Sequence, residues 1–238
     1  MLCYVTDRRA LRVANPAESV VALTRKIEEV AAAGVDWVQV REKDLTTSEL
    51  ASLTRQSLRI AAKPSAKHAS IVRILVNDRL DVAIAERANG VHLGEKSLPV
   101  AEAKRLVQSA LRHHAIDESF LIGVSCHSLE AAEAAERDGV DYIIFGPVFA
   151  TPSKLAFGMP QGLARLARAC RTVAIPVIAI GGITLDNAES CIAAGAAGVA
   201  AIRLFQDPVD PAGAIQRLRQ LVSYHRRRLP ADHRNSVH

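Results

Sequence analysis

Short apolar runs and amphipathic segments alternate eight times along this chain, and that alternation limits the fold more than any single motif does. Runs rich in Val and Ile are typical of parallel strands that are buried on both faces. Segments in which apolar residues recur at every third or fourth position are typical of helices that bury one face. The pattern predicts strands over residues 2–6, 35–40, 74–76, 90–93, 120–125, 142–148, 176–180 and 198–204. It predicts the helices after them over residues 17–33, 47–62, 80–87, 128–138, 185–194 and 210–224, with two more that begin at Pro99 and near 161.

Eight strands that are each followed by a helix predict an α/β fold, a single (β/α)8 barrel of the TIM type. Such barrels usually have about 250 residues, and this chain has 238. We expect residues 1–224 to form the barrel and residues 225–238 to form a basic, flexible tail. A doubly wound open sheet is the alternative, but the first predicted strand lacks the glycine-rich turn with which such folds bind dinucleotides.

The net charge of +5 comes from the C-terminal end, where residues 217–238 contain six arginines and one aspartate. The rest of the chain therefore carries no net charge. No aromatic residues are interleaved with the basic ones to stack on bases, so we expect no nucleic-acid partner. A content of 49% hydrophobic residues excludes an intrinsically disordered chain.

The sequence also indicates where the protein works. It contains no apolar run long enough for a membrane span, so we expect no membrane partner. Its four cysteines form no CxxC pair, and its first residues do not resemble a signal peptide. We therefore expect a cytoplasmic protein. Whether the chain forms a homo-oligomer is left open.

Cations follow the second predicted strand, at the end where barrel enzymes place their active sites. Alternation along the strand puts Gln39, Arg41 and Lys43 on one side. Two cations that converge in a barrel mouth need a counter-charge, so one interpretation is a clamp for phosphate or diphosphate. The other is an ion-pair network in which Glu42 and Asp44 neutralise the two cations.

Asn77 and Asp78 follow the third predicted strand, and two interpretations fit them equally well. Beside a diphosphate, the carboxylate of Asp78 would be a ligand for Mg²⁺, which prefers oxygen ligands and shares them with phosphates. Alternatively, one of the two residues caps the next helix. After the fifth strand, Ser125 is a candidate to hydrogen-bond a ligand, and His127 is a candidate general acid or base.

The connection after the sixth predicted strand is long for a barrel, and long loops are often functional. It contains Thr151, Ser153 and Lys154, whose two hydroxyls and one ammonium group suit a phosphorylated ligand. A solvated turn with the same residues is the alternative.

Paired glycines end the seventh predicted strand, and Ile202 and Arg203 lie in the eighth. The backbone N–H groups of Gly181 and Gly182 can approach a phosphate closely, because glycine has no side chain. Barrels often bind phosphate in the loops after these two strands. The sequence therefore predicts one phosphate site here and a second anion site across the mouth.

Eight short segments occur along the chain in order, namely Thr6-Asp7, VQVREKD (38–44), VNDR (76–79), GVHLG (90–94), GVSCHS (123–128), GPVFATPSK (146–154), AIGGIT (179–184) and AGAAGVA (194–200). As an ordered set they resemble the thiamine phosphate synthase superfamily, which also contains thiazole tautomerases. The resemblance covers the chain from about residue 2 to residue 205.

The resemblance implies a transferase that joins a hydroxymethylpyrimidine diphosphate to a thiazole phosphate, in its plain or carboxylated form. The products are thiamine phosphate and diphosphate, and the metal is Mg²⁺. The implied mechanism is dissociative: diphosphate leaves first, and the thiazole nitrogen captures a pyrimidine carbocation. The implied ligands of the pyrimidine diphosphate are Gln39, Arg41, Lys43, Asn77, Ser125 and Lys154. Those of the thiazole phosphate are Thr151, Ser153, Gly182 and the backbone near Ile202, and Asp78 is the implied Mg²⁺ ligand.

Two positions depart from the family pattern. Ser97 stands where the synthases usually carry a second Mg²⁺-binding aspartate. Either Glu95 substitutes for it, or Mg²⁺ binds more weakly, or the activity differs. Arg203 stands where the synthases usually have serine, so it either strengthens phosphate binding or fills the pocket.

Two other functions remain open at this stage. A thiazole tautomerase isomerises the carboxylated thiazole phosphate without metal, and its catalytic histidine resembles His127. The segments VREKD, NDR and TPSK favour the synthase instead. The remaining alternative is a non-catalytic barrel that binds thiazole phosphate. It is suggested by the serine at position 97, where the synthases usually carry a carboxylate.

Overall fold

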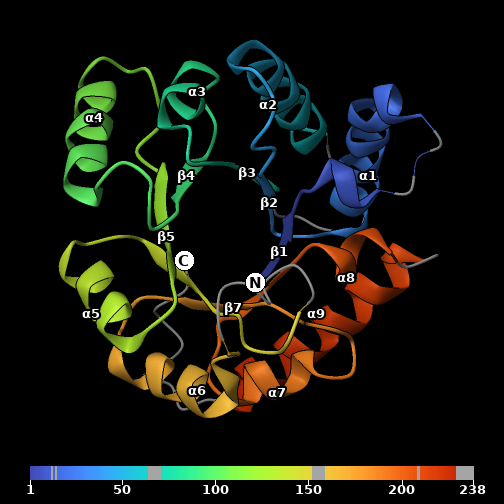
Figure 1. The fold of residues 1–238 in the computed structure, drawn as a ribbon, viewed down its shortest axis with the longest axis vertical. Helices are drawn as coiled ribbons and strands as arrows, with labels where there is room; N and C mark the ends of the chain where they lie inside the picture. The colour runs from blue at the N-terminus through green and yellow to red at the C-terminus, as the bar shows by residue number, and fades with distance from the viewer. Residues whose placement is uncertain (12, 14, 64–70, 152–158, 208–209, 229–238) are drawn as a thin grey trace.

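Eight parallel strands form a closed barrel in chain order, in which β8 pairs with β1 (Figure 1). The computed structural model describes the chain except for residues 12, 14, 64–70, 152–158, 208–209 and 229–238. The closure confirms the expected (β/α)8 barrel and excludes the open doubly wound sheet. The strands are β1 (Leu2–Val5), β2 (Trp37–Val40), β3 (Arg73–Asn77), β4 (Gly90–Leu93), β5 (Leu121–Cys126), β6 (Tyr142–Phe145), β7 (Val177–Ile180) and β8 (Gly198–Ala201).

The helices surround the barrel and cover its outer face (Figure 1). Local signals set several of their ends: the hydroxyl of Ser128 accepts from the backbone N–H of Ala131 at the start of α5. Gly34 ends α1 with a φ of 97°. In the described part of the chain, no helix is long and apolar enough to cross a membrane. The helices are α1 (Ser19–Ala33), α2 (Thr47–Ala61), α3 (Leu80–Ala85), α4 (Val100–Arg112), α5 (Leu129–Arg137), α6 (Gly162–Thr172), α7 (Ala188–Ala193), α8 (Arg203–Gln206) and α9 (Pro211–Arg228), with 3-10 segments η1 (Arg8–Ala10) and η2 (Pro16–Glu18).

Several element ends differ from the sequence-based expectation by one to four residues, and three of them bear on the site or on the tail. Strand β6 ends at Phe145, because Pro147 has no N–H group to donate to a neighbouring strand. The predicted end of the eighth strand at residue 204 is wrong. Strand β8 ends at Ala201, and residues 203–206 form the short helix α8. Helix α9 continues to Arg228, so the expected boundary at 224 falls inside a helix. The remainder of the expected tail lies outside the described residues.

An apolar floor fills the lower part of the barrel interior. The rings of Trp37 and Tyr142 meet edge to face there, with centroids 4.7 Å apart. Gly123 makes room for them, since a Cβ at that position would lie 2.0 Å from Cζ of Tyr142. Any site inside the barrel must therefore lie above this floor, at the carboxyl ends of the strands. The floor consists of Cys3, Val5, Trp37, Leu75, Tyr142, Ile144, Ile178 and Ala200.

Candidate active site at the barrel mouth

Polar side chains line one half of the barrel wall above the apolar floor. They come from adjacent strands, because the register places Asn77 of β3 beside His92 of β4. The Nε2 atom of Gln39 donates to Oδ1 of Asn77 at 2.8 Å. Nε2 of His92 lies 2.9 Å from the hydroxyl oxygen of Ser125 on β5. Strands β7 and β8 contribute apolar residues to the interior, so the mouth has one polar and one apolar wall.

Gln39 offers a buried acceptor to a ligand. The residue is 3% exposed, and its Oε1 atom has no hydrogen-bond partner among the described residues. A buried polar atom without a partner costs about 1–3 kcal/mol. A ligand that donates to Oε1 would recover that free energy, so Gln39 fits its predicted place in a binding site.

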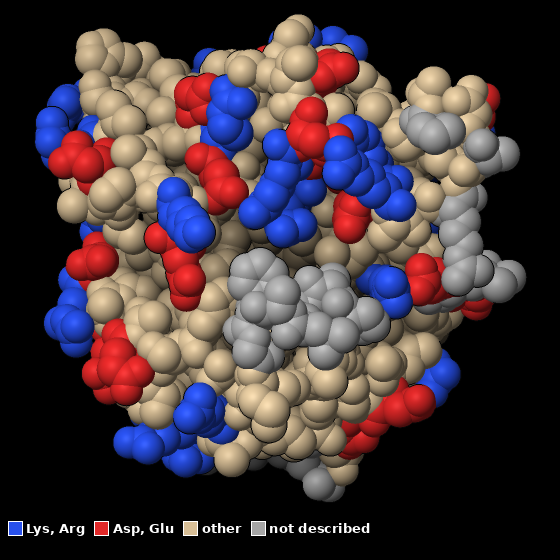
Figure 2. All heavy atoms as spheres, in the orientation of Figure 1, with Lys and Arg blue, Asp and Glu red and all other residues tan. Residues whose placement is uncertain are grey.

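Glu42 and Asp44 do not neutralise the cations that alternate with them. The carboxylate of Glu42 accepts from Nη1 of Arg8 at 3.0 Å, and that of Asp44 accepts from the same guanidinium at 2.6 and 2.5 Å. Among the described residues, the side chains of Arg41 and Lys43 have no carboxylate partner. Lys and Arg side chains gather on this face beside the ends of β1 and β2 (Figure 2). The ion-pair interpretation therefore fails, and the anion clamp stays a prediction.

The contacts with Arg8 hold both carboxylates in place and keep that of Asp44 charged. Hydrogen bonds from Arg8, together with its charge, lower the pKa of Asp44 to about 2, and the same contacts raise the pKa of Arg8 above its usual value. The side chain of Glu42 is 2% exposed. It also accepts from the hydroxyl of Thr6 at 2.7 Å, which joins the end of β1 to the end of β2.

Asp78 does not cap the helix that follows it. The N-cap of α3 is Arg79, which makes no side-chain capping bond. The φ of Asp78 is 62°, in the left-handed region, and its carboxylate contacts the loop after β4. Oδ1 accepts from the backbone N–H of Gly94 at 3.0 Å and from the hydroxyl of Ser97, while Oδ2 accepts from Nδ2 of Asn77 at 2.6 Å. The helix-cap interpretation is wrong for Asp78.

The donor set around Asp78 fits a magnesium ion that takes further ligands from a substrate. The carboxylate of Asp78 and the hydroxyl of Ser97 are oxygen donors in mutual contact. Mg²⁺ is usually held by one or two carboxylates together with waters and substrate phosphates. In the described part of the chain, no three His, Cys, Asp or Glu side chains form a metal cluster, so phosphate oxygens would have to complete the site. Glu95, the other predicted ligand, is not among the partners of Asp78.

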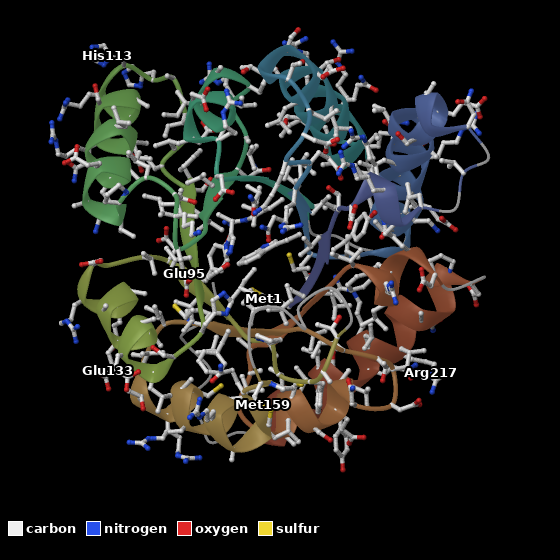
Figure 3. All side chains as sticks on the ribbon, in the orientation of Figure 1. Met1, Glu95, His113, Glu133, Met159 and Arg217 are labelled. Carbon is white, nitrogen blue, oxygen red and sulfur yellow. The ribbon has the colours of Figure 1, made fainter. Side chains whose placement is uncertain are left out.

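His127 lies at the rim of the mouth, where its ring is 34% exposed. Its Nδ1 atom hydrogen-bonds the main-chain oxygen of Gly146. Because a carbonyl oxygen only accepts, Nδ1 carries the proton, and Nε2 of the neutral ring has a free lone pair. Nε2 lies 4.0 Å from Oε1 of Glu95, which Figure 3 shows on the barrel side of the gap between α4 and α5. This geometry fits the predicted acid or base.

The end of β7 provides backbone amides on the opposite side of the mouth. Gly181 and Gly182 have φ values of 97° and 65°. A Cβ on Gly182 would lie 2.7 Å from the oxygen of Ala150, so a larger residue does not fit this turn. The N–H groups of both glycines donate to no acceptor within the described part of the chain. Successive free amides of this kind bind anions, as predicted for this loop.

The structure describes only some of the remaining predicted site residues. Ile202 packs against the apolar floor at the end of β8. Arg203 is exposed at the start of α8, so it does not fill the barrel interior. Thr151 is the last described residue before the gap, and Ser153 and Lys154 lie outside the described residues.

The structure adds His92 and Tyr142 to the residues that the sequence singled out. His92 is 2% exposed, and its Nδ1 atom lies 3.2 Å from the hydroxyl of Tyr142. Alternation from Gly90 along β4 places His92 inside the barrel, and this was the signal available in the sequence. Nothing local indicates its two partners, because both come from other strands.

Comparisons with known proteins place the chain in one enzyme family. The thiamine monophosphate synthase family matches residues 10–205. The chain is 44% identical over 185 residues to a putative thiamine-phosphate synthase of Geobacter sulfurreducens. This match covers 78% of this chain and 80% of the relative. It is 38% identical over 192 residues to the thiamine-phosphate synthase of Moorella thermoacetica, with 81% and 84% covered. The solved structure of a thiamine phosphate pyrophosphorylase from Pyrococcus furiosus superposes with a TM-score of 0.76 at 30% identity, covering 94% of this chain and 96% of the other.

Proposed function

Because the chain belongs to the thiamine monophosphate synthase family, we propose that it is a thiamine-phosphate synthase. This is a transferase that acts on two small phosphorylated substrates, a pyrimidine diphosphate and a thiazole phosphate. The bond between the pyrimidine methylene carbon and the diphosphate oxygen breaks, and diphosphate leaves with the electron pair. The methylene carbon then bonds to the thiazole nitrogen, which supplies the new electron pair.

The pair of unneutralised cations after β2 carries this proposal. A leaving diphosphate gains negative charge as its bond breaks, and Arg41 and Lys43 have no carboxylate partner among the described residues that would compete for them. Arg binds two phosphate oxygens as a fork, and Lys binds as a point charge. Preorganised cations stabilise developing charge without having to reorganise. Lys154 is proposed as a third cation, from outside the described residues.

The polar wall suits the pyrimidine ring. The unpartnered Oε1 of Gln39 is an acceptor for an amino group, and the hydroxyl of Ser125 is in reach of the same interior. Across the mouth, we propose that the amides of Gly181 and Gly182 hold the thiazole phosphate, with Thr151, Ser153 and the backbone near Ile202. The two substrates would then approach each other above the apolar floor.

We further propose that Mg²⁺ takes part, held by Asp78 and by oxygens of the diphosphate. When bound, the ion would supply additional positive charge to the leaving group. The chain's own task there is to orient the carboxylate of Asp78, which it does through Asn77, Gly94 and Ser97. The Glu95 carboxylate remains a candidate second ligand.

A two-substrate assay tests the proposal. Purified protein is incubated with the pyrimidine diphosphate and the thiazole phosphate, with and without Mg²⁺, and thiamine phosphate and diphosphate are measured. Both products should form in equal amounts and only with the metal. Absence of thiamine phosphate at saturating substrates would overturn the proposed synthase, and product without metal would overturn the magnesium site.

Thiazole tautomerase activity is the second candidate, and the position of the His127 ring at the rim of the mouth, with Nδ1 bound to Gly146, favours it. Its assay follows isomerisation of the carboxylated thiazole phosphate without metal. His127→Asn should abolish any isomerisation and leave synthesis largely intact. Loss of synthesis in that variant, with isomerisation retained, would reverse the assignment. A barrel that binds thiazole phosphate but shows neither activity would be the non-catalytic alternative.

The four cysteines, described as free thiols, support the proposal that the enzyme works in the reducing cytoplasm.

A further inference from the structure

Arg8 contacts both carboxylates that follow β2. Its Nη1 atom lies 3.0 Å from Oε2 of Glu42 and 2.6 Å from Oδ1 of Asp44, and its Nη2 atom lies 2.5 Å from Oδ2 of Asp44. The Arg8 side chain is 13% exposed. Arg9 reaches Asp44 as well, at 2.7 Å, from a side chain that is 72% exposed. Arg8 is therefore the less exposed of the two arginines that contact these carboxylates.

The two carboxylates alternate with the two cations of the anion clamp, in the order Arg41, Glu42, Lys43 and Asp44. Each acid is thus one residue away from a cation that would bind diphosphate. A carboxylate that paired with either cation would compete with the substrate for it. Opposite charges attract strongly near a protein surface, where the effective dielectric constant is far below that of water.

We propose that Arg8 is a positioning residue for the diphosphate site. It holds Glu42 and Asp44 at the end of β1 and thereby leaves Arg41 and Lys43 free for the anion. The inference rests on the proposed function, because it takes these two cations as ligands of the diphosphate.

Asp44 is the carboxylate that depends most on Arg8. Glu42 also accepts from the hydroxyl of Thr6 at 2.7 Å and from the backbone N–H of Arg8 at 3.1 Å, so it keeps partners when the guanidinium is removed. The side-chain partners of Asp44 in the described part of the chain are the guanidinium groups of Arg8 and Arg9. Loss of the Arg8 side chain would leave Asp44 with one exposed partner and free to turn toward Lys43.

The test measures binding of inorganic diphosphate by calorimetry, in four proteins: wild type, Arg8→Ala, Asp44→Asn and the double variant Arg8→Ala/Asp44→Asn. Arg8→Ala should weaken diphosphate binding roughly tenfold, as expected if the competing charge of Asp44 costs about 1.4 kcal/mol of binding free energy. The double variant should regain the wild-type affinity within about twofold, because the competing charge is gone. Asp44→Asn alone should bind at least as tightly as wild type.

Two further variants sharpen the experiment. Arg8→Lys keeps the charge but lacks the fork that holds two carboxylates at once, so its affinity should fall between wild type and Arg8→Ala. Arg55→Ala is the matched control, since it removes an ion pair with Glu86 at 2.6 Å on the outer helices. It should bind diphosphate as wild type does.

The double variant distinguishes a positioning role of Arg8 from direct contact with the anion and from a purely structural role. If Arg8 touched the diphosphate itself, or only stabilised the fold, the double variant would bind as weakly as Arg8→Ala, and that result would overturn the proposal. Wild-type affinity in Arg8→Ala would overturn it too. Failure of the wild-type protein to bind diphosphate would refute the anion clamp itself, and with it this inference. The rescue is informative even if Arg8→Ala is less stable, because Asp44→Asn cannot restore the lost ion pairs.

Discussion

The imidazole Nε2 of His92 lies 2.9 Å from the hydroxyl oxygen of Ser125, inside the mouth of the barrel. The other ring nitrogen lies 3.2 Å from the hydroxyl of Tyr142. In the described part of the chain, no other acceptor is present for that buried hydroxyl, so Tyr142 donates to Nδ1. Nε2 then carries the proton and donates to Ser125. The Ser125 proton is consequently not used in this contact, and it is available to a ligand in the barrel mouth.

Tyr142→Phe tests this direction of hydrogen bonds. The variant keeps the ring that packs against Trp37 but removes the donor to Nδ1, so His92 can adopt the other tautomer and accept from Ser125. We expect the KM for the pyrimidine diphosphate to rise about three- to tenfold, the loss of roughly one hydrogen bond. Affinity for inorganic diphosphate should not change, and calorimetry with that anion is the control. An unchanged KM would show that Ser125 does not depend on Tyr142.

Much of the fold is readable from the sequence because buried parallel strands and one-sided helices have different apolar periods. The end of β8 is an exception for a physical reason. The residues from Gly198 to Phe205 are almost continuously apolar, and such a run does not distinguish a strand from a short buried helix. Leu204 and Phe205 are buried in α8, so tertiary packing decides the conformation there.

The sequence indicates which residues are candidates for the site, but it does not indicate which partners they contact. Alternation correctly separates Arg41 and Lys43 from Glu42 and Asp44. The choice of Arg8 as the partner of both acids depends on the pairing of β1 with β2, which no local pattern contains. The sequence leaves Asp78 undecided between a cap and a ligand. The structure excludes the cap, and the left-handed φ of 62° at Asp78 is not apparent from any local pattern.

Arg41→Ala should lower kcat/KM for thiamine phosphate formation about 100-fold or more, as removal of one preorganised charge donor usually does. The loss should appear in kcat as well as in KM, since the guanidinium would act most strongly on the departing diphosphate. Steady-state kinetics with the pyrimidine diphosphate as the varied substrate measures both. Arg105→Ala, which removes a surface ion pair with Glu102 on α4, is the control and should be neutral. A normal rate for Arg41→Ala would mean that the end of β2 is structural.

The contact between Asp44 and Arg8 should make stability depend on pH at the acid end. The pKa of Asp44 is lowered from 3.8 to about 2 in the folded protein, so the unfolded chain binds the proton more readily. The stabilisation is therefore fully present above about pH 5 and is lost as the pH falls toward 2. Asp44→Asn should lower the free energy of unfolding by about 1 kcal/mol at pH 7, after allowance for solvent screening. The difference in unfolding free energy between variant and wild type should narrow below about pH 4. Urea unfolding of both proteins from pH 7 to pH 3 measures it; a constant difference would indicate that packing, not charge, matters.

Ser97→Asp tests the magnesium site most directly. The new carboxylate would lie against that of Asp78, where the Ser97 hydroxyl now donates to Oδ1. Two like charges in contact repel, so the melting temperature should fall without metal and recover when Mg²⁺ is added. The Mg²⁺ concentration for half-maximal synthesis should fall as well, because Mg²⁺ binds more tightly to two carboxylates than to one. Ser97→Ala is the matched control, which removes the hydroxyl without adding charge and should not lower the metal requirement.

If Ser97→Asp needs the same Mg²⁺ concentration as wild type, Asp78 does not hold the ion together with residue 97. Glu95→Gln then tests the other candidate ligand: it raises the requirement only if Glu95 supplies the second carboxylate.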